Sequence, residues 1–205
     1  MQSCKPRASH SRGTKLRSPE PVNAATLGAM SYLQTPAGGY KRVEGSNDQY
    51  DTDEWILIAD TRDGGYLDGF TALRTKDITK VKKVDGFEPE LLKKLKQWPP
   101  AAPEQPISLS SAEAIIRTVG EGRDALTIHQ EKDKPDACFI GAPVDWGRKS
   151  VWLLEIDRHA RWDTEMTKYR LKDITRIDFG GGYEDALLTV SGAKPDRRSG
   201  GHEGK

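Results

Sequence analysis

The chain has only two cysteines, Cys4 and Cys138, among its 205 residues. Two thiols cannot form a disulfide framework, and they cannot supply a zinc knuckle. No segment approaches the run of about 18 apolar residues that a membrane-spanning helix needs, and the N-terminal residues lack the apolar stretch of a secretory signal. We therefore expect a reduced, cytoplasmic protein without a disulfide, a metal centre, a cofactor or a membrane span.

An excess of charge of one sign is also missing, because 32 Lys and Arg residues stand against 31 Asp and Glu residues, for a net charge of +1. Proteins that bind nucleic acid without regard to sequence usually carry a clear basic excess. The whole chain does not fit that class, although a local basic patch is compatible with its composition. Hydrophobic residues make up 35% and charged residues 31%, which suits one domain or two small ones with modest cores.

The chain contains an internal repeat, because residues 66–92 match residues 162–188 at a constant offset of 96 without a gap. The identical pairs include Arg74 and Arg170, Lys76 and Lys172, Asp77 and Asp173, Ile78 and Ile174, Thr79 and Thr175, Gly86 and Gly182, Glu88 and Glu184, Leu91 and Leu187, and Leu92 and Leu188. After a slip of one residue, Trp55, Leu57 and Asp60 also match Trp152, Leu154 and Asp157. So many identities indicate an internal duplication.

Each copy is predicted to be a series of short strands. The predicted strands cover residues 55–59, 66–73 and 79–84 in the first copy, and residues 125–130, 137–141, 151–156, 165–171 and 175–179 in the second. Most are short apolar runs bounded by polar turns. Gly64 and Gly65 supply the positive φ of a tight hairpin turn. Asp77 and Asp173 are each expected to lie at a bend that leads into the last strand of a copy.

Two short helices are predicted. Residues 88–98 place leucines at helical spacing, and the proline-rich segment that follows ends the helix and forms a stiff linker. Ser110 and Glu113 form a capping-box signature that opens a second helix.

These elements divide the chain into five parts. We expect a disordered basic arm or a mis-assigned start at 1–29, a first β-barrel-like unit with a C-terminal helix at 30–98, a linker at 99–107, a second unit with an N-terminal helix at 108–192, and a disordered tail at 193–205.

The order of one helix and five short strands, with a bend before the last strand, resembles the Sm-like small β-barrel. The strings Tyr66-Leu-Asp-Gly-Phe70 and Arg74-x-Lys-Asp-Ile-Thr79 also resemble a motif of uncharacterised bacterial proteins of that shape. The resemblance is fullest over residues 110–190. It implies a mainly β fold with short helices (α+β), made by tandem duplication of a small, strongly curved antiparallel barrel. It further implies RNA binding and assembly into rings by edge pairing.

The Sm-like RNA site is not carried over onto this sequence. The family places a glycine after a basic residue just before the last strand, whereas Asp173 stands at that place here and Asp77 stands there in the other copy. A carboxylate at a base or phosphate pocket opposes RNA binding. RNA binding is therefore the alternative hypothesis and not the first one.

The duplicated Arg-x-Lys-Asp strings are the main candidate site. On a functional interpretation, Arg74, Lys76, Arg170 and Lys172 form a charged surface for a ligand or for nucleic acid. On a structural interpretation, which we favour, the following aspartates accept backbone hydrogen bonds at the bend.

Three other patterns are interpreted as structural. The first is the alternating set Glu155, Asp157 and His159, which has the spacing of metal ligands on one face of a strand. The simpler interpretation is a solvent-facing strand end that runs into its turn. Cys138 lies among apolar residues with no histidine close in sequence, so an inert, buried thiol is expected. Gly180-Gly-Gly182 lacks the Lys-Ser/Thr of a phosphate loop and is expected to be a flexible turn.

No acid–base, nucleophile or metal set converges, so we expect no enzyme. The first hypothesis is a protein-interaction or scaffolding module with an unknown protein partner, contacted through edge strands and apolar helix faces. Binding of RNA or single-stranded DNA is the alternative, and assembly into a homo-oligomer is left open.

Overall fold

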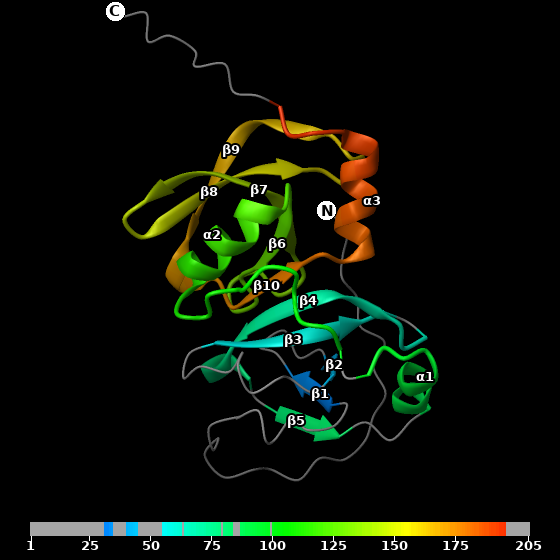
Figure 1. Cartoon of the computed structure of the whole chain (residues 1–205). Coiled ribbons are helices and arrows are strands. Elements are labelled where there is room, and N and C mark those ends of the chain that lie inside the picture. Colours follow the sequence, from blue (N-terminus) through cyan, green and yellow to red (C-terminus); the bar gives the residue numbers. More distant parts are fainter. Residues whose placement is uncertain are drawn as a thin grey trace, which may run out of the picture.

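The structure is a computed structural model of the chain, and it describes residues 31–34, 40–44, 55–62, 64–78, 80–83, 87–98 and 100–195 (Figure 1). The basic arm or mis-assigned start predicted at 1–29 lies outside these residues, as does most of the tail predicted at 193–205. The described part of the chain contains no helix that is long and apolar enough to cross a membrane.

The described residues form ten antiparallel strands, three α-helices and two 3₁₀ turns (Figure 1). The strands are β1 (Ser31–Gln34), β2 (Tyr40–Glu44), β3 (Trp55–Thr61), β4 (Leu67–Arg74), β5 (Lys80–Lys83), β6 (Leu126–His129), β7 (Cys138–Gly147), β8 (Ser150–Ile156), β9 (Trp162–Arg170) and β10 (Arg176–Phe179). The helices are α1 (Glu88–Lys94), α2 (Ala112–Gly122) and α3 (Gly182–Ser191), and the 3₁₀ turns are η3 (Thr75–Asp77) and η4 (Leu171–Asp173). The predicted class, mainly β with short helices, is confirmed.

The strands lie in the order β5-β1-β2-β3-β4-β10-β6-β7-β8-β9. The first five strands of the chain therefore occupy one half of the sheet and the last five the other half, and both halves place their own last strand beside their own first. Figure 1 shows β1 to β5 with α1 in the lower half, and β6 to β10 with α2 and α3 in the upper half. In the described part of the chain the sheet is open, with β5 and β9 at its two ends.

Strand β3 forms where the sequence has its longest apolar run, and both of its faces are covered. Residues Trp55, Ile56, Leu57 and Ile58 expose between 1% and 3% of their surface. The chain then turns at Gly64 and Gly65, whose φ angles are +89° and +82°, into β4. Those angles are open to glycine at low cost, so the predicted tight turn is confirmed.

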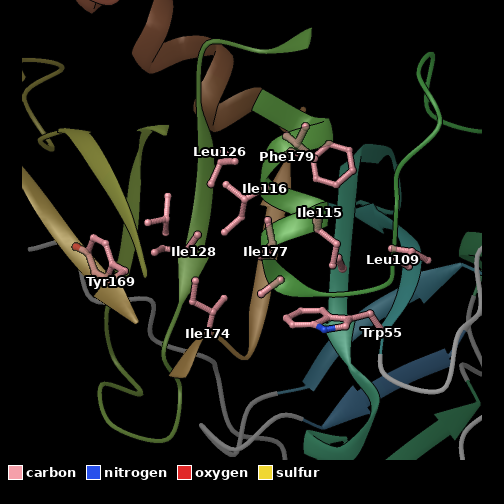
Figure 2. Close-up of a cluster of buried hydrophobic side chains, with 14 of the residues drawn as sticks. Trp55, Leu109, Ile115, Ile116, Leu126, Ile128, Tyr169, Ile174, Ile177 and Phe179 are labelled. Atoms are coloured by element: carbon pink, nitrogen blue, oxygen red, sulfur yellow. The ribbon is translucent and has the colours of Figure 1, made fainter. Parts of the chain in front are cut away.

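The main hydrophobic core is shared by the two halves of the sheet. Helix α2 contributes Ile115 and Ile116, both completely buried, and they pack in one cluster with residues of β6, β8 and β10 and with Trp55 of β3. Figure 2 shows the α2 side chains facing this cluster. Burying one such side chain contributes about 1.5–3 kcal/mol. The first half is thus held to the second by apolar packing as well as by strand pairing.

Three predictions about helices need correction. The N-cap of α2 is Ser111, whose Oγ accepts from the Ala114 amide at 3.1 Å, and not Ser110. Glu113 is paired with Arg117 along the helix instead of reaching back to the cap. Helix α1 ends at Lys94, earlier than predicted, and α3 was not predicted at all. Some strand limits also differ, because β7 continues to Gly147 and β9 begins at Trp162.

The Gly180-Gly-Gly182 string joins β10 to α3, as a turn and not as a phosphate loop. Gly180 has a φ of +70°, and Gly182 is the first residue of α3. The Gly182 amide donates to Oδ1 of Asp68 at 2.8 Å. A carboxylate from β4 therefore caps a helix that belongs to the other half of the sheet.

Candidate functional site

Strands β4 and β10 lie side by side and join the two halves of the sheet, and we call this contact the β4–β10 joint. Phe70 stands opposite Phe179 in the ladder, and their rings stack with centroids 5.6 Å apart. Beyond the last paired residue, the amide of Arg74 donates to the carbonyl of Thr175 at 3.2 Å. The two predicted copies meet at this joint. A site that uses residues of both copies would therefore lie here.

Asp178 is the centre of a polar cluster in the joint. Its carboxylate accepts from Oγ1 of Thr71 at 2.7 Å and from Nε of Arg176 at 2.8 Å. A second oxygen lies 3.0 Å from Nε2 of His129. These partners come from β4, β10 and β6, and the side chain of Asp178 is only 16% exposed. One carboxylate thus ties three strands together at low dielectric, where such bonds are strong.

Arg176 balances the negative charge of this cluster. Burial alone would lower the pKa of its guanidinium, but the negative charges of Asp178, Asp60 and Glu131 outweigh burial and leave the pKa above its usual range. Glu131 is also held by Oγ1 of Thr175, which donates to its Oε2 at 3.2 Å. Arg176 therefore remains a cation at any pH at which the protein is folded.

A half-open cavity of about 190 Å³ lies at the joint and is bordered by this cluster. Its polar lining comes from both halves of the sheet and from α3, and it comprises Asp60, Asp68, Thr127, His129, Cys138, Arg176, Asp178, Tyr183 and Glu184. Oγ1 of Thr127 donates to Oε1 of the buried Glu184 at 2.5 Å. Much of this lining is therefore already engaged in bonds within the protein.

The surroundings of Cys138 differ from those predicted. Its sequence neighbours suggested a buried thiol far from any histidine, but the thiol residue is partly exposed and lines the cavity. His129 stands directly opposite Cys138 in the β6–β7 ladder. The hairpin pairing brings them together, and a sequence scan for neighbouring residues could not detect it. Among the described residues, no group of three or more His, Cys, Asp or Glu side chains could hold a metal ion.

The alternation of Glu155, Asp157 and His159 does not form a ligand set either, because β8 ends at Ile156. Oδ1 of Asp157 instead accepts from the amides of His159, at 2.7 Å, and Arg161, at 3.0 Å, and so closes the turn into β9. Oε1 of Glu155 accepts from the hydroxyl of Tyr169 at 2.7 Å. Burial first, and then the bond and charge of Glu155, raise the pKa of Tyr169 far above its usual value.

The duplicated Arg-x-Lys-Asp residues occupy equivalent places in the two halves but different environments. In the first, Nε of Arg74 lies 2.5 Å from Oδ2 of Asp77, and the two side chains are 10% and 4% exposed. In the second, Nε of Arg170 lies 2.5 Å from Oδ2 of Asp173, and the side chains are 63% and 15% exposed. The same local ion pair is buried in one copy and open to solvent in the other.

The first pair is buried because the second half of the sheet covers it. Nη1 of Arg74 donates to the carbonyl of Lys172 at 2.7 Å, and Nζ of Lys132 lies 2.5 Å from Oδ1 of Asp77. Arg74 is thus a component of the joint, whereas the side chains of Lys76 and Lys172 are exposed. Both aspartates lie at the end of a 3₁₀ turn, as the structural interpretation has it, but their side-chain bonds go to arginines.

Strand β9 offers an open edge at one end of the sheet. In the described part of the chain its one strand neighbour is β8, and most of its side chains are exposed. Asp163 lies at its beginning, where burial and then the negative charges of Glu155 and Asp157 raise the pKa of its carboxyl. Among the described strands this edge has no second neighbour, and its beginning has a local excess of negative charge.

Comparison with known proteins adds no assignment to this geometry, because no protein-family model, no curated protein and no solved structure matches the chain.

Proposed function

We propose that this chain is a protein-interaction module without catalytic machinery, built from two tandem copies of one small, Sm-like β unit. Two features support the duplication. The two halves of the sheet have the same strand order, and the offset of 96 that aligns the sequence copies also aligns η3 with η4 and the beginning of α1 with α3. We propose further that the unit makes contact through the open edge of β9.

The observation that carries this proposal is the difference between β4 and β9, which the repeat makes equivalent. Strand β4 has a neighbour on each side, β3 and β10, whereas β9 has β8 alone in the described chain. An open edge strand is a template for a further strand. The exposed Arg170–Asp173 pair, whose counterpart is buried under a partner strand, lies at the end of the same edge.

The outward amides of β9 can be identified from the bonds at its end. The amide of Leu171 donates to the carbonyl of Lys149, on the β8 side, at 3.1 Å. Because successive residues of a strand direct their backbone groups to opposite sides, the amides of Arg170, Lys168 and Met166 point away from β8. A proline at Lys168 removes one outward donor and leaves the β8–β9 ladder intact.

The test compares Lys168→Pro with Lys168→Thr as a matched control, since the latter retains the amide. Tagged wild-type chain and both variants are purified at moderate salt, and co-purifying proteins are quantified after circular dichroism has shown equal folding. We expect a protein retained by the wild type and by Lys168→Thr to be lost from Lys168→Pro. Retention of no protein by any of the three, or equal retention by all three, would contradict the proposal.

One surface favours the alternative, binding of RNA or single-stranded DNA. Around the β7–β8 hairpin, the guanidinium of Arg117 lies 3.9 Å from the ring centre of Trp146, and Nζ of Lys168 lies 4.8 Å from that of Trp152. Aromatic rings beside cations are the platform on which single strands stack. Salt-sensitive binding of an unstructured oligoribonucleotide, weakened by Trp152→Ala, would favour this alternative. The absence of nucleic acid after purification at low salt would argue against it.

A further inference from the structure

A thiol, an imidazole and a carboxylate are brought together at the cavity of the β4–β10 joint. Cys138 stands directly opposite His129 in the β6–β7 ladder, and residues paired in this way direct their side chains to the same face, with Cβ atoms about 4.5–5.5 Å apart. Nε2 of His129 lies 3.0 Å from Oδ2 of Asp178. All three residues line the cavity. A nucleophile, a base and a group that orients the base thus meet from β7, β6 and β10.

We propose that Cys138 is a reactive thiol, which small, uncharged hydroperoxides that enter the cavity oxidise to a sulfenic acid. His129 is the base that takes the proton of the thiol, and Asp178 is a positioning residue that acts through His129. This inference goes beyond the proposed function and does not depend on it, because the contact at β9 uses other residues.

The hydrogen bond to Asp178 determines how His129 acts on the thiol. A carboxylate accepts from the ring nitrogen that carries hydrogen, so Nε2 is the donor and Nδ1 has the lone pair. The same carboxylate stabilises the imidazolium that forms when the ring takes up a proton. Proton transfer from Cys138 to His129 therefore gives a thiolate beside a cation, which is the nucleophilic form of cysteine.

The charges around His129 allow this transfer. Arg176 stands opposite His129 in β10 and already balances the charge of Asp178, so His129 is not held as a permanent cation. Nη1 of Arg176 also lies 3.9 Å from the carboxylate of Glu131. The other titratable groups that border the cavity are Asp60 of β3, Asp68 of β4, and Tyr183 and Glu184 of α3. Because the proton moves from one residue of the cluster to another, the net charge of the cavity does not change.

The size and the charge of the cavity select the oxidant. The cavity is half-open and has a volume of about 190 Å³, and the carboxylates of Asp60, Asp68 and Glu184 border it beside Asp178. These charges oppose the entry of anions, and the volume opposes large disulfides. Cys138 is partly exposed, so a small molecule can reach its thiol. A hydroperoxide is small and uncharged, and a thiolate attacks it directly.

The proposed step is a two-electron oxidation of sulfur. The thiolate of Cys138 attacks one oxygen of the peroxide, an S–O bond forms and the O–O bond breaks. The electron pair of the broken bond leaves with the second oxygen, which takes the proton from the imidazolium of His129. With hydrogen peroxide the products are the sulfenic acid and water.

The first experiment compares Cys138 with an exposed thiol that has no histidine opposite it. The test chain carries Cys4→Ser, so that Cys138 is its one thiol. The control chain carries Cys4→Ser, Cys138→Ser and Ala101→Cys, because Ala101 is exposed and has no charged residue within two positions. Both chains are treated with hydrogen peroxide at about pH 7, the sulfenic acid is trapped with dimedone, and the product is measured by mass spectrometry.

We expect Cys138 to be oxidised about three- to tenfold faster than the control thiol. An ordinary thiol is only a few per cent thiolate at this pH, and the lower intrinsic nucleophilicity of a more acidic thiol offsets part of the gain in thiolate. Oxidation of Cys138 at the same rate as the control, or more slowly, would overturn the proposal.

His129→Gln distinguishes a base from a residue with only a structural role, because glutamine can hydrogen-bond Asp178 but cannot take the thiol proton. Circular dichroism establishes whether the variant is folded. The rate of alkylation by iodoacetamide should reach half its maximum below about pH 7.5 in the Cys4→Ser chain, and near pH 8.5, the ordinary thiol pKa, after His129→Gln is added. An unchanged profile contradicts the role of His129. If the variant does not fold, a half-maximum near pH 8.5 in the Cys4→Ser chain itself contradicts it.

The charge of the cavity is tested by comparing iodoacetamide, which is neutral, with iodoacetate, which is an anion. The ratio of the two alkylation rates should favour iodoacetamide about fivefold more for Cys138 than for Ala101→Cys, because the carboxylates of the cavity repel the anion. An equal or smaller ratio would overturn the assignment to uncharged oxidants.

Discussion

The two copies of the Arg-x-Lys-Asp string allow one substitution to be made twice, once in a buried setting and once in an exposed one. Arg74→Gln removes a cation whose partner Asp77 is 4% exposed, and it also removes the bond to the Lys172 carbonyl. Arg170→Gln removes a cation that is 63% exposed. The local sequence is the same, so the difference between the two effects reports on the joint alone.

The expected magnitudes follow from burial. Removal of one partner of a buried ion pair costs about 3–5 kcal/mol, because the remaining charge is left uncompensated. Asp77 retains Lys132 at 2.5 Å, so we expect the lower end, about 3 kcal/mol for Arg74→Gln. An exposed pair contributes about 0–1 kcal/mol, which is the expectation for Arg170→Gln. A chain of this size shifts its melting temperature by about 2–4 °C per kcal/mol, so Arg74→Gln should lower it by about 6–12 °C.

The assay is thermal and urea unfolding followed by circular dichroism at a low protein concentration, at which association between copies is negligible. Lys76→Gln and Lys172→Gln serve as controls, because both side chains are exposed and neither should change stability by more than about 0.5 kcal/mol. Equal destabilisation by Arg74→Gln and Arg170→Gln would refute the argument, since it would mean that the local turn, and not the joint, determines the contribution of these arginines.

Three further predictions concern single sites. Gly69→Ala should lower the free energy of unfolding, measured with urea, by more than about 1 kcal/mol. The reasons are the positive φ of this residue and the clash of an added Cβ with the carbonyl oxygen of Phe179. Ser111→Ala should cost about 1 kcal/mol through loss of the α2 cap, while Ser110→Ala should be neutral in the same assay. Because the pKa of Tyr169 is raised in the folded state, its phenol should titrate last in an ultraviolet pH titration. Folding stability should fall as pH rises above about 10, the pKa of an unfolded tyrosine.

Much of the second half of the fold could be predicted from sequence, because its strands coincide with short apolar runs between polar turns. Strands β8 and β10 begin within a residue of the predicted limits. The sequences of strands β1 and β2, in contrast, contain no apolar run from which they could be predicted. They pair with β5 and β3, which are separated from them in the sequence. Helix α3 was missed although the repeat places the counterpart of α1 within it, because the glycines at 180–182 suggested a turn that continued.

The candidate site could be predicted only in part. The Arg-x-Lys-Asp repeat marked residues that do carry the difference between the two halves, but sequence could not tell which copy is covered. The polar cluster around Asp178 was not predicted, since Thr71, His129 and Arg176 come from three strands whose neighbourhood depends on the strand order. A lone aspartate in a short strand with apolar neighbours was the available signal, because such a residue needs a partner when it is buried.

On the proposed duplication, the inner and outer edges have diverged in a direction that explains their different behaviour. The inner joint pairs Phe70 and Phe179, and Ile177 of β10 is completely buried in the shared core. The outer edges have Met166 and Lys83 in place of the two phenylalanines. Charged edges suppress unselective strand pairing, so we expect the proposed contact at β9 to be selective for a partner that matches its register and charge. On this proposal, the inner joint is permanent and sealed by apolar side chains, whereas the outer edge makes a reversible contact governed by charge.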